Sequence, residues 1–189
     1  MSATIFNTPV LSKFLQHLTD FILGLAGWRV QGNLPDLPKF VLIGAPHTSN
    51  WDFVLFLAVI LHLRANVRFM GKAEVFRGPF GSFFRWCGGI PVDRSRSNGL
   101  VEQMVQVCKE SDQFILTIAP EGTRHKVREW KLGFYHIARS AGIPVVMAVV
   151  DGEHKEVHIG RVFRPTGNME ADMKSIQGFF AGVVGIHPH

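Results

Sequence analysis

Cysteine is scarce in this chain, because only Cys87 and Cys108 occur among its 189 residues. Two cysteines supply neither a zinc ligand set nor a persuasive disulfide framework, so a reducing, cytoplasmic setting is expected. The sequence also lacks the basic start of a secretory signal, a G-x-S-x-G sequence around a nucleophilic serine and any recognised nucleic-acid-binding motif. These absences disfavour a disulfide-stapled secreted domain, a serine hydrolase and a nucleic-acid-binding protein.

Linkers, low-complexity segments and internal repeats are missing as well. Hydrophobic residues make up 47% of the chain, enough for one substantial core, and ten prolines and nineteen glycines are scattered along it. Strand-like and helix-like patterns alternate, which is typical of helices layered on a central sheet. The strand-like runs are 40–43, 67–70, 90–92, 114–118 and 143–148, and the helix-like runs are 53–63, 80–86, 100–109 and 134–141. The run 53–63 is apolar nearly all round, which predicts a helix buried in the core. We predict a single α/β domain with a central mixed, mostly parallel sheet flanked by helices, plus an N-terminal amphipathic helix.

Positive charge is concentrated in the middle of the sequence. Residues 64–131 contain twelve Lys or Arg and seven Asp or Glu, whereas the rest of the chain contains eight of each, so the formal net charge of +5 arises in that segment. Such asymmetry suggests an anionic partner, and on charge alone a phosphate group, an acidic lipid surface or nucleic acid would fit. An ordinary solvated basic face is the plain alternative.

Residues 9–28 show the pattern of an amphipathic helix. Their apolar side chains recur at helical spacing, with Lys13, Gln16, His17 and Asp20 between them. Because these polar residues interrupt it, the segment lacks the run of about twenty apolar residues that a membrane-spanning helix needs. Two outcomes stay open, since the helix could pack on the core or lie in the interface of a bilayer. We assign residues 1–28 to this helix and residues 29–189 to the domain.

The sequence HTSNWD at residues 47–52 places an imidazole and a carboxylate five positions apart. On one regular helix these side chains would point about 140° apart. A strand at 40–43, a turn at 44–46 and helix N-caps at 48–50 instead put His47 before a helix and Asp52 in its first turn. Asp52 could then accept the imidazole N–H and leave His47 as a general base. A loop histidine beside an unrelated helix-start acid is the alternative.

A polar turn directly follows the strand predicted at 114–118. Its glycine, Gly122, lets the backbone approach a ligand closely, and Thr123 and Arg124 offer a hydroxyl and a planar fork for phosphate oxygens. Glu121 could hold that arginine or an acceptor hydroxyl. An ordinary charged turn is the alternative.

Three more cations lie close to predicted strand ends. Arg94 follows the strand at 90–92, and it could reach the same anion or pair only with Asp93, an exposed pair that contributes about 0–1 kcal/mol. Lys72 follows the strand at 67–70, and Lys131 precedes a helix. Both are weaker candidates for contacts with an anionic substrate.

A metal site is not indicated, although the chain has nine histidines. His154 and His158 do not form an H-E-x-x-H motif, and the strand-like alternation around them places them about 13 Å apart. We expect no required metal and no bound cofactor.

Taken together, these motifs resemble those of the glycerolipid acyltransferase family, which includes bacterial 1-acylglycerol-3-phosphate acyltransferases. The resemblance runs from about residue 40 to residue 149. The matching segments are HTSNWD at 47–52, KAEVF at 72–76, GIPVDR at 89–94, PEGTR at 120–124, KLG at 131–133 and IPV at 143–145. The chain departs from the family pattern at Pro46, Ala119 and His125, where Asn, Phe and Ser are usual, and these departures bear on the acceptor.

The resemblance implies an O-acyltransferase that works by direct general-base catalysis. His47 would deprotonate an acceptor hydroxyl, which attacks a thioester, and Asp52 would orient and support the imidazole. The residues implied in holding the acceptor's phosphate end are Arg94, Glu121, Gly122, Thr123 and Arg124, with Lys72 and Lys131 as possible additions.

The implied donor is acyl-CoA or acyl carrier protein, a co-substrate, and the implied acceptor is a lysophospholipid such as 1-acylglycerol 3-phosphate. Glycerol 3-phosphate or another lysolipid as acceptor stays open, as does a non-catalytic lipid-binding or lipid-transfer protein. Because acyl substrates reside in bilayers, we expect peripheral attachment to the cytoplasmic face of a membrane. The N-terminal helix and the aromatic and arginine residues of 76–86 would supply it, with core packing as the alternative.

Overall fold

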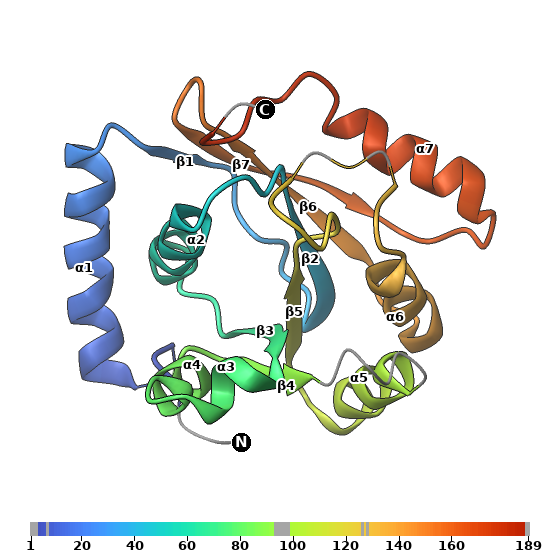
Figure 1. The fold of residues 1–189 in the computed structure, drawn as a ribbon, viewed down its shortest axis with the longest axis horizontal. Helices are drawn as coiled ribbons and strands as arrows, with labels where there is room; N and C mark the ends of the chain where they lie inside the picture. Colours follow the sequence, from blue (N-terminus) through green and yellow to red (C-terminus); the bar gives the residue numbers. More distant parts are fainter. Residues whose placement is uncertain (1–3, 7, 93–98, 126, 128, 188–189) are drawn as a thin grey trace.

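A seven-stranded sheet with helices on both faces forms the centre of the molecule (Figure 1). The computed structural model describes residues 4–6, 8–92, 99–125, 127 and 129–187. The strands are β1 Arg29–Gln31, β2 Lys39–Ala45, β3 Val67–Lys72, β4 Gly89–Val92, β5 Phe114–Ile118, β6 Val145–Asp151 and β7 Glu156–Phe163. The helices are α1 Pro9–Leu25, α2 Trp51–His62, α3 Ala73–Arg77, α4 Gly81–Trp86, α5 Leu100–Glu110, α6 Gly133–Ala141 and α7 Met169–Phe179.

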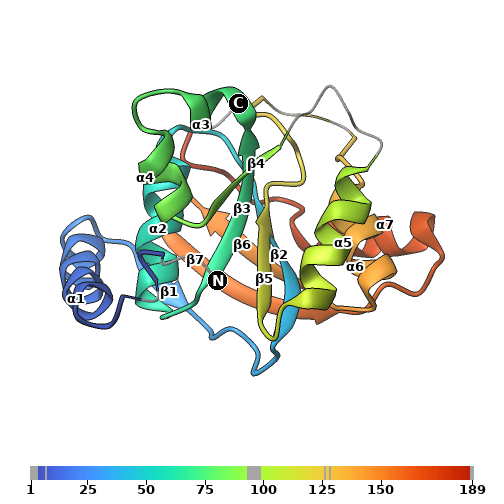
Figure 2. The same cartoon turned by 90° about the horizontal axis from the view of Figure 1, so that it is seen from below.

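The strand order is β1-β7-β6-β2-β5-β3-β4, and every neighbouring pair is parallel except β6 and β7. This arrangement confirms the predicted α/β class with a mixed, mostly parallel sheet, and α1 confirms the predicted N-terminal helix. The parallel strands β2, β3, β4, β5 and β6 all end at the same edge of the sheet, which is the upper edge in Figure 2. In such sheets, function gathers beyond the carboxyl ends of the strands.

Strand β2 shows how the sequence divides the core between the two faces. Successive side chains of a strand point to opposite faces. Val41 and Ile43 belong to a core that α5, α6 and α7 cover, whereas Phe40 and Leu42 belong to a core that α2 covers. All four are almost completely buried, and each contributes about 1.5–3 kcal/mol through removal of its side chain from water.

Several predicted boundaries were wrong. The turn predicted at 44–46 is partly strand, because β2 continues through Ala45 in register with Val149 of β6. The strand predicted at 143–148 begins two residues later, at Val145. The helix predicted at 53–63 was also read as buried all round, yet Val54 of α2 is 53% exposed. This exposed side matters because the opposite side of α2 forms one wall of the site.

Candidate functional site

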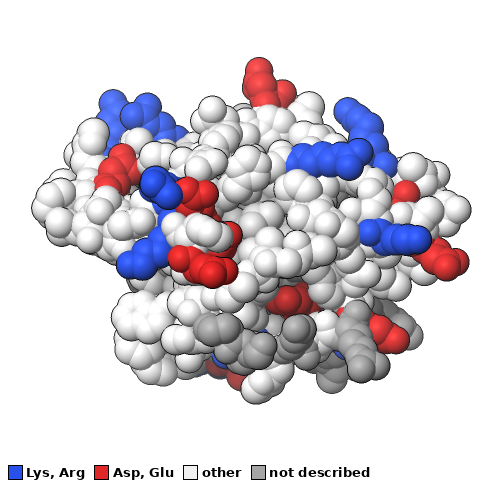
Figure 3. Space-filling model, turned by 90° about the horizontal axis from the view of Figure 1, so that it is seen from above, with Lys and Arg blue, Asp and Glu red and all other residues white. Residues whose placement is uncertain are grey.

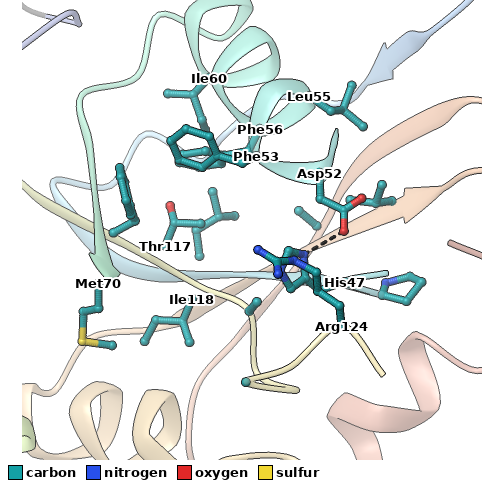
Figure 4. Close-up of a pocket in the computed structure, with 18 of the residues that line it drawn as sticks. His47, Asp52, Phe53, Leu55, Phe56, Ile60, Met70, Thr117, Ile118 and Arg124 are labelled. Atoms are coloured by element: carbon teal, nitrogen blue, oxygen red, sulfur yellow. Dashed lines mark ion pairs between the residues drawn. The ribbon is translucent and has the colours of Figure 1, made fainter. Parts of the chain in front are cut away.

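His47, which follows β2, and Asp52, in the first turn of α2, come together. Nδ1 of His47 lies 2.7 Å from Oδ2 of Asp52 (Figure 4). The same carboxylate oxygen accepts hydrogen bonds from the backbone N–H groups of Thr48 at 2.7 Å and Ser49 at 2.8 Å. A chain that leaves a strand, turns at residues 48–50 and enters a helix therefore joins two residues that no continuous helix could pair.

The environment of Asp52 favours its ionised form. Burial alone raises the pKa of Asp52, but the hydrogen bonds from His47, Ser49 and Thr48 and the attraction to His47 outweigh burial, so its pKa lies below the ordinary value of 3.8. An ionised carboxylate can only accept hydrogen bonds, so the proton of the short contact resides on Nδ1 of His47. Nε2 of His47 is then left as a proton acceptor, which is the form that a general base requires.

Glu121 supports the turn from a distant part of the sequence. Its Oε2 accepts a hydrogen bond from the backbone N–H of His47 at 2.6 Å. Glu121 follows β5, the parallel neighbour of β2, and this neighbouring position brings the carboxylate to the histidine backbone. The sequence prediction placed Glu121 beside an arginine or an acceptor hydroxyl and missed this contact, since nothing in the sequence signals a backbone partner 74 residues away.

A cavity of about 840 Å³ adjoins the pair and extends between α2 and the sheet. Its apolar lining includes Phe53, Phe56 and Ile60 from α2, and Thr117 and Ile118 lie across from them on β5 (Figure 4). The sequence analysis read α2 as core because its apolar residues give the same signal whether they meet other side chains or line an opening. Its cavity-lining role could therefore not be predicted.

Four of the predicted acceptor-binding residues line this same cavity, namely Lys72, Gly122, Thr123 and Arg124. Gly122 has a φ of +67°, in the left-handed region that favours glycine. Lys131 is not among the lining residues, although its Cγ packs close to Gly122. Arg94 lies outside the described residues. The roles of these side chains, and of His47 and Asp52, stay predictions.

Metal ligands do not gather in the part of the chain that the structure describes, where no group of three or more His, Cys, Asp or Glu is suited to hold an ion. His154 was predicted to lie on a strand with His158, but it occupies the turn before β7 and pairs with Asp151, whose Oδ2 is 2.8 Å from its Nδ1. Cys87 and Cys108 are both free and buried, and burial raises the pKa of the Cys87 thiol to about 11.

Comparison with known proteins establishes the family. The sequence model described as Acyltransferase matches residues 28–151, which contain both His47 and Arg124. The chain belongs to the acyltransferase family. This membership confirms the resemblance to glycerolipid acyltransferases that the motifs indicated.

Curated members of the acyltransferase family resemble this chain over most of its length. It is 27% identical to 1-acyl-sn-glycerol-3-phosphate acyltransferase of Haemophilus influenzae, over 72% of this chain and 60% of that protein. It is 29% identical to the Streptococcus pneumoniae protein of the same name, over 79% of this chain and 57% of that protein. The chain thus matches under two thirds of the length of these relatives.

A solved structure shares the fold. The crystal structure of the 1-acyl-sn-glycerophosphate (LPA) acyltransferase PlsC from Thermotoga maritima superposes with a TM-score of 0.63 and 21% sequence identity. The match covers 89% of this chain and 76% of that chain. This acyltransferase-family chain therefore has the same architecture.

Proposed function

We propose that this chain is an O-acyltransferase that moves a fatty acyl group from a thioester donor, acyl-CoA or acyl carrier protein, to a hydroxyl of a lysophospholipid such as 1-acylglycerol 3-phosphate. The observation that carries the proposal is the His47–Asp52 pair beside a largely apolar cavity that Arg124 also lines. The pair suits proton removal, the cavity suits an acyl chain and the guanidinium suits a phosphate.

The reaction needs only proton transfer through one imidazole. Nε2 of His47 takes the proton of the acceptor hydroxyl, and the oxygen attacks the thioester carbonyl to form a tetrahedral intermediate. The C–S bond then breaks, the thiolate takes the proton back from the imidazolium, and the ester and the free thiol leave. Asp52 holds the ring and offsets its positive charge while the proton resides on it.

The apolar cavity explains where the transferred acyl chain would lie. Its walls come from α2, β2, β5, β6 and β7, and a volume of about 840 Å³ lies within the range of pockets that enclose a ligand. Each methylene removed from water contributes about 0.8 kcal/mol, so binding a long chain there supplies much of the energy that positions the thioester. Gly44 contributes no side chain to this space.

The cationic side of the cavity would hold the acceptor's phosphate. Arg124 is exposed at the turn after β5, and Lys72 is exposed at the end of β3, so both line the cavity where solvent reaches it. A guanidinium can bind two phosphate oxygens at once, which fixes the orientation of the acceptor hydroxyl. We extend phosphate binding to Arg94, Gly122 and Thr123, whereas Glu121 holds the backbone N–H of His47 and Lys131 supports the Gly122 turn.

Helix α1 is oriented so that its apolar stripe faces outward. Phe14 and Phe21 are each 64% exposed, whereas Gln16 is 9% exposed. The inward side buries Leu23 in the core that α2 covers and also makes polar contacts: Asp20 Oδ1 lies 2.7 Å from Nδ1 of His62, and Gln16 accepts from Nε of Arg64 at 2.8 Å. A helix that packed on the core through its whole apolar stripe would bury the phenylalanines as well.

This reversed orientation supports attachment of α1 to a bilayer interface, and the cytoplasmic face of the membrane is part of the proposal. In the described residues no helix is both long and apolar enough to cross a bilayer. The outermost edge of the molecule at the α1 end shows few charged side chains in Figure 3, whereas acidic and basic groups lie close together just inward of it. Trp51, Phe80 and Phe83 are exposed aromatic residues that could extend the contact.

Sedimentation with anionic vesicles tests this attachment. Replacing Phe14 and Phe21 together by serine should release the protein from the vesicles, because they are the two exposed aromatic residues among the six large exposed hydrophobic side chains described on α1. Val162→Ser removes an exposed apolar group from β7 and serves as the matched control. Equal binding of the double variant and the control would rule out attachment through α1.

An acceptor panel tests the proposed activity. The purified chain is given palmitoyl-CoA or palmitoyl acyl carrier protein with 1-acylglycerol 3-phosphate, glycerol 3-phosphate or lysophosphatidylcholine, and the products are resolved by mass. We expect acylated product from 1-acylglycerol 3-phosphate. A preference for glycerol 3-phosphate would change the assigned acceptor and leave the proposed acyl transfer in place. Tight lipid binding with no acyl product from any pair would support a lipid-transfer protein and overturn the proposal.

A further inference from the structure

A second cavity lies on the other side of the His47 turn. It has a volume of about 440 Å³, and its walls come from α7, from the segment between β5 and α6 and from residues 182–187. Its lining includes His47, Thr48, Glu121, Gln177, Val183 and Gly185. The steps of the proposed reaction leave this space unassigned.

The two cavities meet at the proposed base. Pro46, His47 and His125 line both of them. A group bound in the second cavity would therefore reach His47 from the side opposite to the acyl chain. A thioester has two substituents, the acyl chain on carbon and the carrier on sulfur, and two cavities that join at the catalytic imidazole match that division.

The C-terminal wall of the second cavity is tied to the His47 turn. The backbone N–H of His187 donates to Oγ1 of Thr48 at 3.1 Å, and the backbone N–H of Gly152 donates to the carbonyl of Val184 at 2.8 Å. Gly185 is buried against Thr48 so closely that a Cβ atom there would lie 2.5 Å from the threonine Cγ2. The wall is thus held in a fixed position relative to the base.

The charge of the lining separates the two cavities. Among its described residues the second cavity has a carboxylate, Glu121, and no lysine or arginine, whereas the first has Lys72 and Arg124. A phosphate dianion would therefore favour the first cavity. The amide of Gln177 and the rings of Trp130 and Phe180 suit a neutral chain that alternates amide and alkyl groups.

We propose that the second cavity binds the pantetheine part of the phosphopantetheine arm that coenzyme A and acyl carrier protein share. This assignment rests on the proposed function. The arm carries two amides and a dimethyl group and ends in the sulfur that bears the acyl group. With the arm in the second cavity and the acyl chain in the first, the thioester carbon lies beside His47. When the C–S bond breaks, the thiol leaves through the second cavity.

Donor truncation tests the assignment. Val183→Trp fills the second cavity, and Gln177→Leu removes its amide without added volume. Each is assayed with palmitoyl-CoA, palmitoyl acyl carrier protein and the N-acetylcysteamine thioester of palmitate, which lacks most of the arm. The matched control is Val162→Trp, at an exposed position of β7 outside both cavities. Circular dichroism reports whether each variant folds.

We expect kcat/KM with both carriers to fall at least tenfold in Val183→Trp and at least threefold in Gln177→Leu. The kcat/KM with the truncated donor and the KM of the acceptor should each change less than twofold. The assignment would be overturned by an equal loss of kcat/KM with the truncated donor, by a loss confined to one carrier, or by a rise in the acceptor KM alone. None of these outcomes would affect the proposed function, because the wild-type activity stands. A wild-type chain that transfers no acyl group from any donor would overturn the proposed function, and this assignment with it.

Discussion

Replacing Asp52 by asparagine removes one negative charge from the site and keeps the shape of the side chain. Asp52 Oδ2 accepts three hydrogen bonds, from His47 Nδ1 and from the backbone N–H groups of Thr48 and Ser49. The amide oxygen of asparagine can keep the two backbone bonds. Because one oxygen accepts all three bonds, an amide oxygen in its place also keeps the contact to Nδ1 of His47. The neutral group cannot offset the charge of an imidazolium. We therefore expect the fold to survive and catalysis to slow.

The expected loss can be worked out from these contacts. A hydrogen bond to a charged partner contributes about 1.5–3 kcal/mol, which corresponds to a rate factor of about 10–100. The amide keeps the same contacts, so the loss comes from the missing charge. We predict that kcat of Asp52→Asn falls about 10–100-fold, while the acceptor KM changes less than about threefold, because the carboxylate touches the base and not the acceptor.

Urea titration at two pH values provides a second measure of the same substitution. Because the pKa of Asp52 lies below 3.8 in the folded chain, its contribution to the free energy of unfolding is complete above that pH and is lost as the pH falls through the lowered pKa. The wild type should therefore lose more stability than Asp52→Asn between neutral pH and about pH 3. Turnover of Asp52→Asn within twofold of the wild type, with the same acid sensitivity, would refute the reasoning.

Three further substitutions probe other parts of the molecule. Gly44→Leu places a side chain in the first cavity, where a Cβ atom meets nothing within 4 Å, so we expect a folded protein whose rate with palmitoyl-CoA falls more than its rate with octanoyl-CoA. An unchanged ratio of the two rates would show that the acyl chain does not bind in this cavity. Arg124→Ala should raise the acceptor KM about tenfold with a smaller change in kcat, whereas exposed Arg161→Ala should change neither, and equal effects would argue against phosphate binding. Tyr135→Phe removes a buried phenol that donates to Oδ2 of Asp172 at 2.8 Å, so urea titration should show a loss of about 1–3 kcal/mol in unfolding free energy with turnover kept; an unchanged midpoint would show that the bond is dispensable.

The strongest sequence patterns predicted the fold. Residues 114–118 are uniformly β-branched or apolar and form β5 with the predicted bounds, and the apolar repeat of residues 9–28 forms α1. Elements with weak patterns were missed. β1 is three residues long, and α7 mixes Met, Glu, Lys and Gln over a short buried side, so neither gives a periodic signal that stands above its neighbours.

The candidate site was predictable where function depends on spacing along the chain. His47 and Asp52 lie in one turn, and a strand–turn–helix interpretation is enough to bring them together. Contacts that depend on packing could not be predicted. The hydrogen bond that the His47 N–H donates to Glu121 joins the segments that follow two parallel strands. The outward apolar side of α1 depends on the burial of Gln16 on its inward side. A hydropathy pattern identifies the apolar and polar sides of a helix but does not determine which side packs against the rest of the protein.

The measurement that tests the central claim most directly compares acyl transfer by His47→Ala and His154→Ala. Nδ1 of His154 lies 2.8 Å from a carboxylate oxygen of Asp151, so the control removes a similar ion pair, but its side chain is 66% exposed and lines neither cavity. With 1-acylglycerol 3-phosphate as acceptor, kcat should fall at least about 10²-fold in His47→Ala and stay at the wild-type value in His154→Ala. Wild-type turnover in a folded His47→Ala protein would contradict the account.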